Sequence, residues 1–170
     1  PQLQQHADYP APKTLRALVK QGAIDASPPD GFSAGTEASQ WLIHQAHNDD
    51  PRPLYGLVFG SITDIAQAIH DDPGIKDHLR VYSIGSWNTR MDKAAREYLY
   101  KNHTDLWWIE ADTTFRGMYV GGKHDGDLGN KTFLDQHVRG HGALGDFLVG
   151  KLGAIKMGDT PSLLYLLRGN

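Results

Sequence analysis

Three short apolar runs that alternate with two helical patterns most constrain the fold of this chain. The runs cover Pro53–Gly60, Leu79–Gly85 and Leu106–Ala111. Residues 61–72 and 91–102 lie between them and repeat apolar side chains at the spacing of an amphipathic helix. Strands that alternate with helices at this spacing form βαβ units with parallel strands. The sequence therefore predicts an open, mostly parallel α/β sheet with flanking helices.

The segments on either side of this pattern are predicted to be helices and loops. Residues 25–35 and the glycine- and aspartate-rich residues 115–130 have the composition of loops. The predicted helices are residues 12–21, residues 36–47, a pair within 132–152 that breaks near Gly140–Gly142, and a last helix that opens at Asp159 or Thr160. The sequence contains no internal repeat, and we expect a single domain over residues 1–170.

Composition excludes several classes of function. The chain has 170 residues and a net charge of −3, and no basic stripe that would favour nucleic acid. No apolar run approaches the roughly 18 residues that a membrane-spanning helix needs. There are no cysteines, which excludes disulfides, thiolate metal sites and cysteine nucleophiles. The nine histidines are scattered and match no zinc-binding spacing. These observations predict no nucleic acid and no membrane as partner.

Polar side chains follow each of the three predicted strands. In open parallel sheets, ligands bind at the carboxyl ends of the strands. The candidates at these ends are Ser61, Thr63 and Asp64, then Ser86, Trp87, Asn88 and Thr89, then Glu110, Asp112 and Thr113. A structural interpretation stands beside the functional one, because Ser61 or Thr63 suits a helix cap and Asn88 suits a turn.

Five segments resemble the nucleoside hydrolase family. LYGLVFGSITDIAQAIHDDPGI, residues 54–75, is similar to the family's apolar strand and its GPLTNIA turn. VYSIGSWNTRMDKAA, residues 81–95, is similar to the next strand, a sugar-contacting Asn and a DPEAA helix start. One branch of the family is the Sde182-type nucleoside hydrolase-like domain, which was first described as cellulose-binding. Three further segments resemble this branch: TFRGMYVGG, RGHGALGDF and IKMGDTPSLLYLL.

The resemblance implies an open α/β sheet with a Ca²⁺ ion at the strand ends. Two metal ligands carry over to this chain, the backbone carbonyl of Thr63 and the carboxylate of Asp159. Asn88 would contact ribose hydroxyls, and we also expect substrate contacts from Trp87, Glu110 and His141. Calcium suits such a site because it takes six to eight oxygen ligands. Asp159 has a simpler interpretation as a helix cap, and His141 as a structural histidine.

The sequence departs from the family pattern at two places. The family's aspartate cluster, DxDxxxDD, occurs nowhere in the chain. We therefore expect the first one or two strands and the catalytic residues to lie in a missing N-terminal segment. Gly158 stands where the hydrolases carry a histidine before the late aspartate.

Three hypotheses follow. The first is a Ca²⁺-dependent hydrolase of N-glycosidic bonds that acts on a nucleoside or sugar once the missing aspartates are supplied. The second is a carbohydrate-binding module without catalysis, for which Trp41, Trp87, Trp107 and Trp108 are candidate platforms. The third is a scaffold role in a larger protein. Members of the family form dimers or tetramers, so a homo-oligomer is also an expectation.

Overall fold

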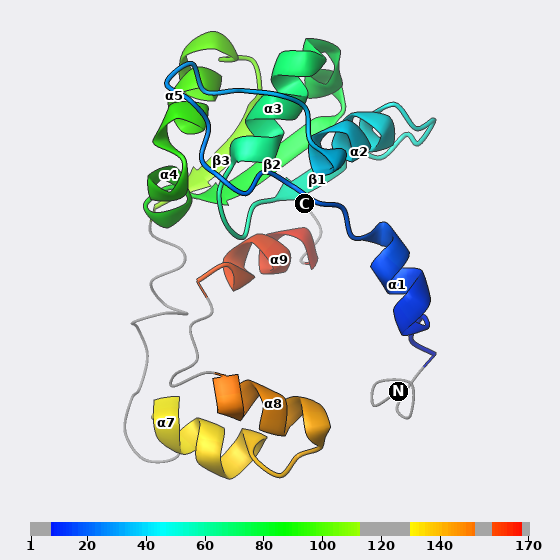
Figure 1. Cartoon of the computed structure of the whole chain (residues 1–170), viewed down its shortest axis with the longest axis vertical. Coiled ribbons are helices and arrows are strands. Elements are labelled where there is room, and N and C mark those ends of the chain that lie inside the picture. Colours follow the sequence, from blue (N-terminus) through cyan, green and yellow to red (C-terminus); the bar gives the residue numbers. More distant parts are fainter. Residues whose placement is uncertain (1–7, 113–129, 152–157, 168–170) are drawn as a thin grey trace. The chain divides into compact units, whose positions relative to one another are not determined.

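The computed structural model describes residues 8–112, 130–151 and 158–167, and a parallel sheet lies at its centre (Figure 1). The strands are β1 (Leu54–Leu57), β2 (Leu79–Ile84) and β3 (Trp107–Ala111), and they are neighbours in chain order. All three run parallel, and Val81 pairs with Gly56 on one side and Trp108 on the other. The predicted α/β class and the parallel sheet are confirmed.

The helices lie before, between and after the strands. In order along the chain they are α1 (Pro12–Leu18), α2 (Glu37–Ala46), α3 (Thr63–Asp71), the 3-10 helix η2 (Pro73–Asp77), α4 (Trp87–Met91), α5 (Lys93–Asn102), α7 (Asn130–Phe133), the π-helical turn η4 (Leu134–Val138), α8 (Ala143–Lys151) and α9 (Thr160–Leu167). The described residues fall into two compact units. One holds residues 20–112 and 159–167, and the other holds residues 8–19, 130–151 and 158.

The helix predicted over residues 91–102 is present as α5, and a short helix that was not predicted, α4, precedes it and ends at Asp92. The backbone of Asp92 leaves the helical region, with φ −149° and ψ 88°. Its carboxylate then accepts the backbone N–H of Ala95 and caps α5. An aspartate at this position satisfies an amide that the first turn of a helix otherwise leaves unpaired. The new helix α4 begins at Trp87, directly beyond the end of β2.

One face of the sheet packs under α3 and α5, as Figure 1 shows. Leu79 and Val81 of β2 point to this face because side chains alternate along a strand. They pack with Ile69 of α3 and Leu99 of α5 in the hydrophobic core. None of these four side chains has exposed surface. Burial of these side chains contributes about 1.5–3 kcal/mol each to the free energy of unfolding.

The opposite face of the sheet packs against α9, the last described helix (Figure 1). Tyr82, Ile84 and Ala111 are buried there. The ring of Tyr165 on α9 lies 5.5 Å from the ring of Tyr82 and 6.2 Å from the ring of Trp107, centroid to centroid. The predicted C-terminal helix is present and covers the sheet, and Asp159 precedes its first residue.

The second unit contains the predicted break between two helices. Gly140 and Gly142 have φ of +74° and +88°, in the left-handed region that only glycine enters without strain. The chain therefore turns between η4 and α8 where the sequence predicted it. Most of the predicted loop over residues 115–130 lies outside the described residues. Within the described parts, no helix is both long and apolar enough to span a membrane.

Candidate functional site

The carboxyl ends of the three strands lie along one edge of the sheet. The backbone N–H of Val58 donates to Tyr82 O at 2.9 Å, and the N–H of Gly85 donates to Ala111 O at 3.0 Å. These bonds continue the parallel ladder past the ends of β1 and β2. Residues 59–63, 85–89 and 110–112 therefore share one edge, which we call the strand-end edge. A ligand of an open parallel sheet binds at this place.

Thr63, a predicted metal ligand, is buried at this edge and is bound to protein groups. Its hydroxyl lies 2.6 Å from Asp92 Oδ2 and 2.9 Å from Ser61 Oγ. A carboxylate only accepts, so Thr63 donates to Asp92 and accepts from Ser61. Thr63 is also the first residue of α3, and a helix directs such carbonyl groups along its axis towards the next turn. The hydrogen bonds of the Thr63 side chain to Asp92 and Ser61 fix the turn after β1.

Asp92 joins three segments beneath the strand-end edge. It has 1% exposed surface, and its carboxylate also accepts the N–H and the hydroxyl of Ser27. Burial opposes ionisation of this carboxyl, but the bonds from Ala95, Thr63 and Ser27 outweigh burial and lower its pKa. Asp92 is thus a charged structural centre, and nothing in the sequence indicated this role beyond its place near a helix start.

Asn88, the predicted sugar contact, is buried with 1% of its surface exposed. Its Oδ1 accepts the backbone N–H of Ile84 and closes the turn after β2. Its Nδ2 has no hydrogen-bond partner among the described residues. In this conformation the amide faces the protein, and a ribose contact by Asn88 stays a prediction.

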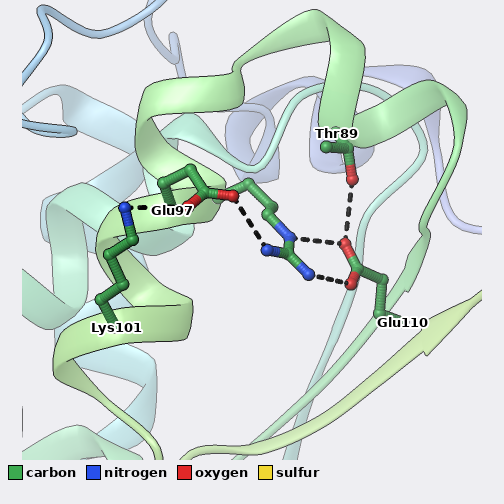
Figure 2. A network of polar contacts seen from close by, with 5 residues as sticks. Thr89, Glu97, Lys101 and Glu110 are labelled. Carbon is green, nitrogen blue, oxygen red and sulfur yellow. Dashed lines mark hydrogen bonds and ion pairs between the residues drawn. The ribbon is translucent and has the colours of Figure 1, made fainter.

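Glu110, another predicted substrate contact, holds a network of polar contacts (Figure 2). Its two oxygens accept from Arg96 Nε at 3.0 Å and Arg96 Nη2 at 2.7 Å, and Thr89 Oγ1 donates to it at 2.9 Å. Burial raises the pKa of Glu110, but these donors outweigh burial and hold it below its usual value. Arg96 also contacts Glu97. Glu110 is thus committed to protein partners, and its role as a substrate contact stays a prediction.

Two aromatic side chains and two polar ones are left exposed at the strand-end edge. Trp87 follows β2 and is 60% exposed, and Phe59 follows β1 and is 56% exposed. Ser61 and Asp112 are also exposed, and Asp112 has no hydrogen-bond or ion-pair partner among the described residues. Trp87 is among the residues predicted from sequence, whereas Phe59 falls within the apolar run Pro53–Gly60 and was not a site candidate. Strand alternation was the available signal, because it places Phe59 on the face opposite the buried Val58.

Asp159 and His141, the remaining predicted site residues, are described in separate units. The backbone oxygen of Asp159 accepts the hydroxyl of Ser162 at 2.7 Å, and burial raises the pKa of its carboxyl. His141 is exposed, with Nδ1 3.0 Å from Arg139 O. Its role as a substrate contact stays a prediction.

The described residues do not form a calcium site by themselves. Among them, no three side chains of His, Asp or Glu gather as metal ligands. Asp159 and the carbonyl of Thr63 supply two of the six to eight oxygens that calcium takes. The carboxyl of Asp159 is half-buried, and burial raises its pKa. The calcium ion stays a prediction that needs further ligands.

Comparison with known proteins agrees with the fold. The family model for the cellulose-binding Sde182, nucleoside hydrolase-like domain matches residues 1–170. A solved structure, a nucleoside hydrolase-related hypothetical protein from Saccharophagus degradans associated with carbohydrate metabolism, is similar with 27% identity and a TM-score of 0.68. The similarity covers 94% of this chain and 38% of that chain, so the chain spans well under half of that protein. No curated protein sequence matches the chain. The chain belongs to the Sde182-type family of cellulose-binding, nucleoside hydrolase-like domains.

Proposed function

We propose that the domain binds carbohydrate at the strand-end edge, through the exposed rings of Phe59 and Trp87. The observation that carries this proposal is that the polar candidates at the edge bind other protein groups, whereas the aromatic side chains there face solvent. Thr63, Asn88 and Glu110 have the polar character of a catalytic site but hold the loops in place. The groups that face solvent are aromatic rings with a hydroxyl and a carboxylate beside them.

The exposed groups match the chemistry of a sugar ring. A pyranose presents an apolar face of C–H groups and a rim of hydroxyls. Phe59 and Trp87 offer large exposed apolar surfaces to such a face. Ser61 and Asp112 offer hydrogen bonds to the hydroxyl rim. A β-linked glucan is the ligand class that also fits the name of the family and the carbohydrate association of the similar structure.

A second candidate function is calcium-dependent cleavage of an N-glycosidic bond. It is favoured by Asp112, an exposed carboxylate at the end of β3 with no protein partner among the described residues. Glycoside hydrolysis uses carboxyl groups as acid and as base or nucleophile. Asp159 and the Thr63 carbonyl are the groups that this chain would offer to the metal, with the other ligands coming from the expected N-terminal segment. Bound calcium would supply an activated water.

The test of the second candidate is release of free base from inosine and uridine by a chain that includes the expected N-terminal segment. We expect release with added calcium and none with a chelator, and an Asp112→Asn variant that is inactive. No release from either nucleoside with calcium present would contradict this candidate and leave carbohydrate binding unaffected.

The test of carbohydrate binding is calorimetric titration with cellotetraose. We expect Trp87→Ala to weaken binding about tenfold, because the variant loses one aromatic face. Met91→Ala is the matched control, since Met91 is exposed on the same helix with 47% of its surface accessible. Equal affinity of Trp87→Ala and the wild type would contradict the proposal.

A further inference from the structure

A pocket of about 380 Å³ lies between β3 and the C-terminal end of α5, outside the exposed groups of the strand-end edge. It is lined by Tyr100, His103, Thr104, Leu106, Trp108 and Glu110. The last three residues alternate along β3 and its approach, so they point to one face of the sheet. The volume is in the range of small-molecule pockets.

Two aromatic rings in this pocket are held by one guanidinium. Arg96 lies over the ring of Tyr100 at 4.3 Å and over the ring of Trp108 at 5.8 Å, measured from Cζ to the centroid. The indole N–H of Trp108 donates to Ser83 Oγ at 2.9 Å. Tyr100 is 59% exposed even so. The pocket therefore presents a preformed aromatic wall, which lowers the entropy lost when a ligand binds.

The charges around the pocket cancel one another. Arg96 is paired in bidentate fashion with Glu110 and contacts Glu97 as well. Burial lowers the pKa of His103, which keeps this imidazole neutral near pH 7. An anion would find the guanidinium already paired, and a cation would find the carboxylate already paired. The ligand that suits the pocket is neutral.

The polar groups of the pocket suit a ligand rich in hydroxyls. Thr104 is exposed at its rim, and the Tyr100 hydroxyl has no hydrogen-bond partner among the described residues. His103 Nδ1 is buried and also lacks a partner within the described parts of the chain. Its Nε2 lies 2.9 Å from the hydroxyl of Tyr98. Such buried polar atoms are usually satisfied by water or a ligand.

We infer that this pocket is a second carbohydrate-binding site, in which a neutral pyranose ring packs against Tyr100 and Trp108. The inference rests on the proposed function for the class of ligand and is otherwise independent of Phe59 and Trp87. With two sites on one domain, a long glucan would bind more tightly than a short one, because the second contact becomes intramolecular.

The experiment is calorimetric titration of the whole chain with cellotriose, which is short enough to report each site. The wild type is expected to bind two molecules, and Tyr100→Ala one. Tyr100→Phe retains the ring and is expected to bind two. Thermal melting of each variant is measured alongside, and Tyr100→Ala is expected to fold because the side chain is exposed.

The outcomes separate this inference from the proposed function. One site in the wild type that Trp87→Ala removes and Tyr100→Ala leaves unchanged would overturn the second site alone. One site that Tyr100→Ala removes and Trp87→Ala leaves unchanged would support the pocket and contradict the strand-end proposal. Binding that neither variant alters, or no binding of cellotriose, would overturn both.

Discussion

Thr89 on α4 donates a hydrogen bond to Glu110 on β3 at 2.9 Å, and this bond ties the loop after β2 to the neighbouring strand (Figure 2). The residue before it, Asn88, accepts the N–H of Ile84. Two successive side chains thus fix the short helix whose first residue is the exposed Trp87. A ring that is held in advance loses less conformational entropy on binding.

This relationship predicts that Thr89→Val weakens sugar binding without touching the ligand. The variant keeps the shape of the side chain but cannot donate to Glu110. We expect affinity for cellotetraose to fall about threefold to tenfold, as α4 gains freedom that binding must remove. Thr14→Val is a control at an exposed threonine on α1. Calorimetry on both variants tests the prediction. Unchanged affinity of Thr89→Val for cellotetraose would show that the Thr89–Glu110 hydrogen bond does not support sugar binding.

Glu110→Gln is predicted to lower the free energy of unfolding by about 1–3 kcal/mol at pH 7. The variant removes the bidentate carboxylate partner of Arg96, whose side chain is 18% exposed, and leaves Glu97 as its charged partner. The pKa of Glu110 is lowered in the folded state, so its stabilisation is present above its usual value of 4.5 and is lost as pH falls through the folded value.

Urea unfolding at pH 7 and near pH 3 checks the Glu110 prediction. The difference between wild type and Glu110→Gln should be largest at pH 7 and should shrink in acid. A difference that stayed constant with pH would show that the ionised carboxylate does not stabilise the fold.

Asp92→Ala is predicted to destabilise the domain by about 2–4 kcal/mol. The variant leaves the N–H groups of Ser27 and Ala95 and the hydroxyl of Thr63 without their acceptor in a buried place. Thermal melting measures the effect. Asp64→Ala is a matched comparison, since Asp64 accepts from Ala23 and Thr36 but is less buried, and it should cost less. An Asp92→Ala variant as stable as the wild type would be inconsistent with this account.

Asp159→Ala is predicted to lower calcium affinity sharply if the domain holds the metal that its family resemblance implies. The carboxyl of Asp159 has its pKa raised by burial, and a bound cation would lower that pKa. Calcium titration by calorimetry compares the variant with the wild type. Asp146→Ala, a change to another aspartate, is the control. Equal calcium binding by the two variants would remove Asp159 from the site.

Sequence periodicity predicted the strands and the main helices, because each apolar run has one face that must be buried. Val81 and Leu99 follow this rule and are fully buried. Helix α5 was predicted, but α4 and the break before α5 were not. The break lies at Asp92, which is held by Ser27 and Thr63, 65 and 29 residues away in the chain. The spacing of apolar residues cannot predict hydrogen bonds between residues that lie so far apart in the chain.

The strand-end positions of the candidate residues were predicted from sequence, and their ligand contacts stay predictions. Asn88 and Glu110 were predicted to lie at strand ends, as they do, and to contact the ligand. In the structure Asn88 faces Ile84, and Glu110 faces Arg96 and Thr89. A polar residue after a strand can bind a ligand or hold the turn, and only its neighbours in space decide between the two roles.

The most direct test of the account is the indole N–H spectrum of the ¹⁵N-labelled chain during titration with cellotetraose. The chain has four tryptophans, so four indole signals are expected, and single Trp→Phe variants assign them. The account predicts that the Trp87 signal moves with added sugar while the Trp41 signal stays in place. A Trp87 signal that does not move at saturating sugar would contradict carbohydrate binding at the strand-end edge.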